Sequence, residues 1–98
     1  MKTKNPTVYI MTNKIQGILY IGVTSDLIRR VSEHKNGTGS DFTSKYRCYL
    51  LVWYQSFETM FEGISNEKLL KMKSRLYKIK LIENRNPAWN DLSKEFFQ

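Results

Sequence analysis

The chain has 98 residues, and its 16 Lys and Arg against 9 Asp and Glu give a formal net charge of +7 at pH 7. Hydrophobic residues at 41% and aromatics at 13% exclude a disordered chain, and one cysteine excludes an internal disulfide or a cysteine-based zinc site. No apolar run approaches the roughly 20 residues of a membrane span, and no export signal opens the chain. We therefore expect one cytoplasmic domain over residues 1–98, with a core from about residue 7 to residue 92.

A β-hairpin and a helix are predicted for the first half of the chain. The β-branched and aromatic run 7–12 predicts a strand, residues 13–17 a turn, and residues 18–23 a second, antiparallel strand. Thr24-Ser25-Asp26 supplies oxygens that suit a helix start, so a helix is expected over 27–36, ended by Gly37. Residues 37–47 are expected to form a polar loop.

A buried strand and further helices are predicted for the second half. Residues 49–57 are apolar almost throughout, which favours a central strand. Residues 58–84 predict helix, with a possible break around 71–74, and residues 1–6 and 93–98 are expected to be loose ends. Four apolar residues at helical spacing are expected in the core, namely Leu69, Met72, Leu76 and Ile79. The fold class is α+β: a small three-stranded, mostly antiparallel sheet flanked by helices.

Two tyrosines are predicted to share one face of the hairpin. Tyr20 and Gly22 alternate with apolar neighbours on the second strand, and Tyr9 lies on the first strand, on the same face in a suitable register. Gly22 would leave space beside Tyr20 in which a bulky group could approach the backbone. The alternative is that both tyrosines are half-buried sheet residues with their hydroxyls at the rim.

Arg30 and His34 are predicted to lie together on the helix that follows. At about 100° per residue they sit at the edge of the apolar face formed by Leu27 and Val31, whereas Arg29 points away. A guanidinium suits phosphate oxygens, and an imidazole exchanges protons near neutral pH. The alternatives are a solvated arginine in a salt bridge and an ordinary helix-edge histidine.

The motifs Thr7-Val8-Tyr9 and Tyr20-Ile21-Gly22, with ten residues between the tyrosines, resemble the signature of the GIY-YIG nuclease superfamily. Arg30, His34 and Glu67 stand where that superfamily has its arginine, its tyrosine or histidine, and its glutamate. The segments YIGVTSDLIRRVSEHKNG, NEKLLK and ENRNPAWNDL resemble in particular the small stand-alone bacterial branch, related to the N-terminal nuclease domain of the excinuclease C subunit. Thr7 replaces the usual glycine. Ile79 stands where an asparagine is frequent, so Asn84 or Asn86 would have to substitute for it.

The resemblance implies a metal-dependent endonuclease, a hydrolase that cuts phosphodiester bonds in DNA. It implies that Arg30 binds the scissile phosphate and that Glu67 holds one Mg²⁺ or Mn²⁺. It favours Tyr9 as the general base, although the residues themselves leave Tyr9, Tyr20 and His34 open. From the residues alone, Glu67 could equally form a surface ion pair with Lys71 one turn later.

The excess of positive charge predicts nucleic acid as the partner, although lysines that only confer solubility would give the same charge. The resemblance to the nuclease superfamily implies DNA rather than RNA. The candidate contacts to nucleic acid are Gly22, Lys14, Lys35, Lys45, Lys71, Lys73, Arg75 and Lys78. With the whole chain assigned to one nuclease-like domain, we expect low sequence specificity and a role in DNA repair or processing. The alternatives are a non-catalytic nucleic-acid-binding module on the same fold and a basic domain that binds a protein.

Overall fold

The computed structural model describes residues 5–96, which form a three-stranded sheet with helices on both faces. The strands are β1 (Thr7–Thr12), β2 (Leu19–Thr24) and β3 (Leu50–Ser56). The order in the sheet is β2-β1-β3, and both pairs are antiparallel. The prediction that the third strand is central is therefore wrong. An apolar run indicates burial, but long-range pairing decides strand order, and the wholly buried β1 lies between the other two.

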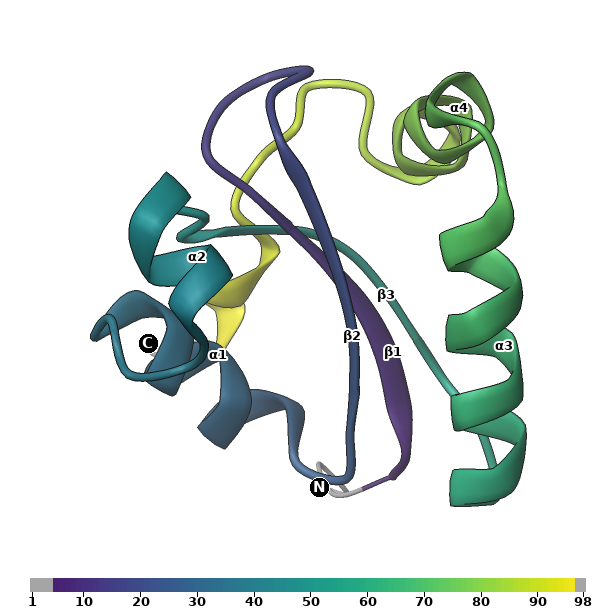
Figure 1. Cartoon of the computed structure of the whole chain (residues 1–98). Coiled ribbons are helices and arrows are strands. Elements are labelled where there is room, and N and C mark those ends of the chain that lie inside the picture. Colours follow the sequence, from purple (N-terminus) through teal and green to yellow (C-terminus); the bar gives the residue numbers. More distant parts are fainter. Residues whose placement is uncertain (1–4, 97–98) are drawn as a thin grey trace.

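The helices divide between the two faces of the sheet (Figure 1). One face carries α1 (Leu27–Lys35), α2 (Asp41–Tyr46) and a short 3-10 helix, η1 (Leu92–Glu95). The other face carries α3 (Met60–Met72) and α4 (Arg75–Arg85). Within the described residues, no helix is both long and apolar enough to cross a membrane.

Side-chain alternation along β1 divides the core into two clusters. Tyr9 and Met11 pack with Leu27 and Val31 of α1 on one face, whereas Val8 and Ile10 pack on the other face with residues such as Trp53 and Ile82. Successive side chains of a strand point to opposite faces, so each cluster takes every second residue of β1. The tyrosine face is the face covered by α1 and α2.

The helix boundaries follow local capping signals. Asp26 accepts a hydrogen bond from the Arg29 backbone N–H and begins α1, as predicted. Thr59 forms a capping box with Glu62 at the start of α3. The predicted break in the second helical segment is confirmed, because Lys73 is extended and a new N-cap at Ser74 begins α4.

Two segments predicted to lack regular structure contain helices. The predicted loop 37–47 contains α2, which begins at the N-cap Ser40 and ends at Arg47 in the left-handed conformation. A serine N-cap followed by Asp41 in the first turn is the local signal that indicates this helix. The predicted loose end 93–98 contains part of η1, in which Ser93 is buried. Of the expected loose ends, residues 1–4 and 97–98 lie outside the described residues.

The predicted core stripe on the second helical segment is largely wrong. Leu69, Met72 and Leu76 are exposed, whereas Ile79 packs at the margin of the core. The break at Lys73 redirects the chain, so apolar residues on either side of it do not form one continuous face. Three hydrophobic side chains are left facing outward as a result.

Candidate active site

Gly22 lets the phenol ring of Tyr9 cross the edge strand. Tyr9 and Gly22 are direct cross-strand partners, and a Cβ on Gly22 would lie 2.5 Å from the Tyr9 hydroxyl oxygen. The space that the sequence analysis leaves open for a ligand at Gly22 is therefore filled by Tyr9. The role of Gly22 in this structure is to admit the tyrosine ring, since any larger residue would displace it.

The Tyr9 hydroxyl lies at one end of a buried chain of hydrogen bonds. It is 2.9 Å from His34 Nε2, and His34 Nδ1 is 2.9 Å from Thr43 Oγ1. The Thr43 hydroxyl in turn donates to the Ser40 carbonyl oxygen. With that hydrogen committed, Thr43 can accept from His34 Nδ1–H, which leaves the Nε2 lone pair to accept from Tyr9. The network is therefore satisfied by the imidazole tautomer that carries its proton on Nδ1.

The loop and helix that follow α1 hold the imidazole in place. Tyr9, His34 and Thr43 are almost wholly buried. A Cβ at Gly39 would collide with His34 Nδ1, so a glycine is required there. No sequence motif marks Gly39, Ser40 or Thr43 as site residues, because only the fold brings α2 against α1.

Both ring systems are neutral at pH 7, and burial strengthens this preference. Burial, together with the positive charge of Arg30, lowers the pKa of His34 to about 4, against a smaller opposing effect of Glu33. Burial also raises the pKa of Tyr9 above its ordinary value, and nearby Tyr20 adds to this while Arg30 opposes it. His34 is therefore a proton acceptor and Tyr9 a proton donor in the resting protein.

Arg30 reaches from α1 over the two tyrosines. Burial disfavours its charge, but Glu33 and the hydroxyls of Tyr9 and Tyr20 outweigh this and raise the pKa of Arg30 above its ordinary value. Its Nη1 lies 3.0 Å from Glu33 Oε1, and the side chain keeps 28% of its surface exposed. A permanent cation with remaining donors thus lies beside the tyrosine hydroxyls.

Glu67 comes from the opposite layer, where α3 packs along the edge strand β2. A Cβ on Gly63 would lie 3.2 Å from Val23, and eight residues later Lys71 lines a depression beside Tyr20. Eight helical residues rise about 12 Å, and the strand from Val23 to Tyr20 spans about 10 Å. The two elements therefore run antiparallel and in step, and Glu67 lies midway along the β2 edge.

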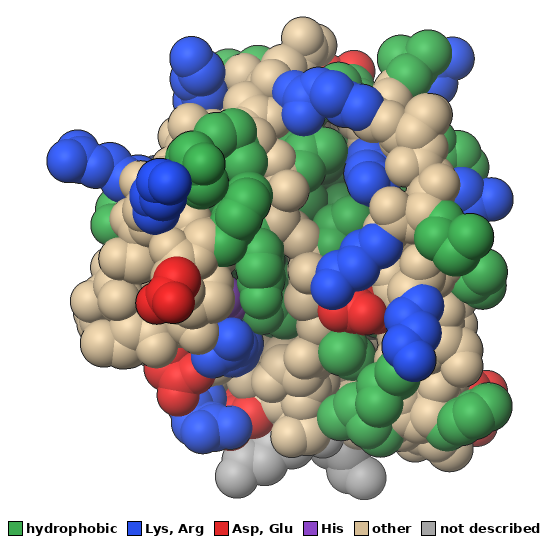
Figure 2. All heavy atoms as spheres, viewed as in Figure 1, with side chains coloured by type: hydrophobic (Ala, Val, Ile, Leu, Met, Phe, Trp, Pro, Cys, Tyr) green, Lys and Arg blue, Asp and Glu red, His purple; other side chains and the backbone are tan. Residues whose placement is uncertain are grey.

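Lys71 joins the two layers at this edge. Its Nζ lies 3.0 Å from Glu67 Oε2, and the Glu67 side chain is only 13% exposed. The depression of about 290 Å³ that Lys71 lines also includes Tyr20, Phe42 and Lys78. Figure 2 shows that this face of the molecule is hollowed between the α1–α2 side and α3, with Lys and Arg side chains on both sides of the hollow. Tyr9, Tyr20, Arg30 and His34 thus form one cluster, and Glu67 is connected to the adjoining depression through its ion pair with Lys71.

Several of the predicted nucleic-acid contacts are engaged within the protein. Lys35 Nζ is 2.6 Å from Asp91 Oδ2 and donates to the Tyr49 carbonyl oxygen. Arg75 donates to the carbonyl oxygens of Gln16 and Gly17 and so ties down the hairpin turn. These two side chains have structural partners, whereas Lys14 and Lys45 are exposed.

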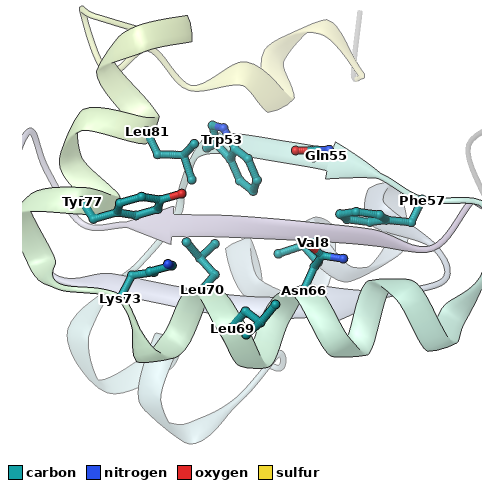
Figure 3. Close-up of a pocket in the computed structure, with 10 residues that line it drawn as sticks. All are labelled: Val8, Trp53, Gln55, Phe57, Asn66, Leu69, Leu70, Lys73, Tyr77 and Leu81. Atoms are coloured by element: carbon teal, nitrogen blue, oxygen red, sulfur yellow. The ribbon is translucent and has the colours of Figure 1, made fainter.

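Lys73 belongs to a different hollow, which lies between the sheet, α3 and α4 (Figure 3). That hollow of about 220 Å³ is lined mainly by apolar side chains, among them Leu70, Leu81 and Phe57. Tyr77 and Lys73 contribute its polar groups at one end. None of the predicted catalytic residues lines it.

Asn86 has a structural role. It is buried, its Nδ2 donates to the carbonyl oxygens of Val52 and Asn90, and its Oδ1 accepts from the Asn90 backbone N–H. Asn84 is exposed on α4. The amide of Asn86 is therefore fully engaged in holding the segment after α4 against β3.

Residues 5–80 match the family model of the GIY-YIG catalytic domain. A UPF0213 protein of Staphylococcus saprophyticus is 37% identical over 75 residues, covering 76% of this chain and 90% of that protein. A UPF0213 protein of Clostridium perfringens is 33% identical over 88 residues, covering 90% and 94% respectively. The solution NMR structure of a UPF0213 protein from Bacillus halodurans superposes with a TM-score of 0.57 at 30% identity, over 92% of this chain and 95% of that one. The chain belongs to the GIY-YIG nuclease family, among small bacterial proteins of the UPF0213 group.

Proposed function

We propose that this protein is a divalent-metal-dependent endonuclease that hydrolyses phosphodiester bonds in DNA with low sequence specificity, in repair or processing of DNA. One observation supports this most strongly. The Tyr9 hydroxyl is hydrogen-bonded to a buried, neutral His34 and lies beside the cationic Arg30. A proton donor and acceptor in contact, next to a fixed positive charge, are the components that hydrolysis of a phosphodiester requires.

Tyr9 would act as the general base through His34. A neutral phenol is a poor base, because its oxygen gains a proton only if it releases its own. His34 Nε2, 2.9 Å away, is placed to take that proton as Tyr9 accepts one from the attacking water. The Tyr9 proton thus moves to the imidazole, and the water proton replaces it on the phenol oxygen. Tyr20, beside both rings, would orient the water.

Arg30 would bind the scissile phosphate. Its guanidinium keeps its charge at any accessible pH and offers several N–H donors with fixed geometry. Charge on the phosphate oxygens increases in the transition state, so this contact would strengthen as the reaction proceeds. The Glu33 carboxylate restricts the orientation of the guanidinium.

The residues present fit one hard divalent cation. Within the described residues no group of three or more His, Cys, Asp or Glu side chains could hold a metal ion. The resemblance to the superfamily assigns Glu67 as the protein ligand. Mg²⁺ keeps several waters and takes phosphate oxygens, so one carboxylate can suffice. The Lys71 ammonium already lies against this carboxylate, which indicates a position that favours positive charge. When bound, Mg²⁺ or Mn²⁺ would neutralise the charge on the leaving 3′ oxygen.

Paired substitutions with neighbouring controls test this proposal. Glu67→Ala should abolish cleavage of labelled DNA in Mn²⁺ and leave binding in chelator nearly unchanged, with exposed Glu58→Ala as the control. Arg30→Ala should reduce both, and cleavage more than binding, because its contact strengthens in the transition state. Arg29→Ala is the matched control, since Arg29 is 65% exposed and shares the partner Glu33.

A Glu67→Ala protein that cuts at the wild-type rate would refute the metal ligand. A wild type that binds DNA and RNA but cuts neither would replace the nuclease by a non-catalytic binding module. Cleavage of RNA in preference to DNA would correct the substrate.

A further inference from the structure

A row of aromatic rings leads from the buried site to the surface. Tyr20 lies 5.8 Å from Phe42 between ring centroids, and Phe42 lies 4.8 Å from Tyr46. At the inner end of the row, Tyr20 packs against Tyr9 and His34. The outer two rings are 42% and 38% exposed respectively, although aromatic rings of this size normally favour burial. The row therefore presents ring surface to solvent directly beside the predicted catalytic cluster.

Positive charge surrounds the exposed end of this row. Lys45 Nζ lies 5.3 Å from the centroid of Tyr46, on the same short helix. Lys71 and Lys78 line the depression in which Phe42 and Tyr20 also lie. Cations spaced around exposed aromatic rings match a ligand that has anionic groups next to flat ring systems.

We propose that Phe42 and Tyr46, the two aromatic residues of α2, form a stacking platform for unpaired bases and direct the protein to single-stranded or locally unpaired nucleic acid. This inference rests on the proposed function and specifies its substrate. Bases in a duplex present their faces to each other, so an aromatic platform can engage them only where pairing is lost. Because Phe42 neighbours Tyr20, a base stacked on Phe42 would lie close to the predicted catalytic cluster. The lysines around the depression would hold the flanking phosphates.

Binding without a divalent ion tests the platform separately from catalysis. The probe is a fluorescein-labelled DNA single strand of about 12 nucleotides, compared with its own duplex by anisotropy in chelator at fixed salt. Tyr46→Leu and Phe42→Leu keep apolar bulk but remove the aromatic face. Each should weaken single-strand binding by roughly tenfold and leave duplex binding within about twofold. Phe42→Trp should restore single-strand binding and excludes misfolding as the cause.

Two exposed aromatic residues away from this row provide matched controls. Phe61→Leu removes a ring that is 80% exposed on α3. Tyr77→Leu removes a tyrosine that, like Tyr46, has a lysine amine over its ring, here Lys73 at 5.1 Å. Both control variants should bind the single strand as the wild type does.

The possible results separate the platform from the nuclease. Unchanged single-strand affinity in Tyr46→Leu and Phe42→Leu, or an equal loss on duplex, overturns the platform whether or not the protein cuts. A dimer in sedimentation that these variants dissociate also overturns it, and assigns the rings to a second copy of the chain. A wild type that stacks single strands through these rings but never cuts in Mn²⁺ supports the platform and refutes the nuclease.

Discussion

Acid should destabilise this protein through the single imidazole of His34, and the structure predicts by how much. Burial and the charge of Arg30 lower the pKa of His34 to about 4, from an ordinary value of 6.5. The unfolded chain therefore binds a proton between these values that the folded protein does not. Above pH 6.5 the imidazole is neutral in both states, and the free energy of unfolding is highest. As the pH falls toward 4, protonation of the unfolded chain lowers it. The full effect on the free energy of unfolding is about 3 kcal/mol, and about 2 kcal/mol of it is lost between pH 7 and pH 5.

Urea unfolding at pH 7 and pH 5 measures this loss, since most carboxylates remain ionised in that range. His34→Gln keeps a hydrogen-bonding group and removes the titration, so its stability should change much less over the same interval. Because the chain has one histidine, NMR of the imidazole also reports its pKa and tautomer directly. A wild type with equal stability at the two pH values, or an imidazole that titrates near 6.5, would refute the reasoning.

Four further predictions concern the support of the site and the binding of substrate. Thr43→Val should lower the free energy of unfolding by about 1–3 kcal/mol, because it leaves a buried imidazole N–H without its acceptor. The exposed control Thr38→Val should lower it by less than about 0.5 kcal/mol, as measured by thermal or urea unfolding. Gly22→Ala should displace the phenol ring packed on it, lowering stability by about 1–3 kcal/mol and cleavage far more. Lys35→Met should destabilise the fold, because it leaves the Asp91 carboxylate without its cation. It should not change DNA affinity at fixed salt. A loss of DNA affinity without a loss of stability would show that Lys35 contacts DNA. DNA binding should weaken roughly tenfold or more between about 50 and 200 mM salt, and a flat affinity would argue that the positive charge serves solubility.

The sequence by itself determines the hairpin, the start of α1 and the break between α3 and α4. These features depend on local chemistry, such as β-branched runs, Asp26 as an N-cap and Ser74 as a second N-cap. The two motifs at their spacing, followed by Arg30, His34 and Glu67, also indicate the nuclease family, and the family model and the relatives confirm that family.

Tertiary structure alone decides which partners each of these residues has. Strand order depends on pairing between distant segments, which is why the apolar β3 lies at an edge and β1 at the centre. Gly22 appears in the sequence as open space, but its cross-strand register with Tyr9 fills that space. Charge alone cannot distinguish Lys35, which is paired within the fold, from a lysine that faces solvent.

His34 shows most clearly which properties follow from the sequence and which follow from the tertiary structure. Its position on the helix follows from periodicity, but its hydrogen bond at Nδ1 depends on Thr43, nine residues later. Its lowered pKa depends on burial and on the charge of Arg30. Hydrogen bonding and desolvation act over a few ångströms of space rather than over a few positions of chain. The sequence can therefore name candidate residues for the site, whereas the folded structure determines their protonation and orientation.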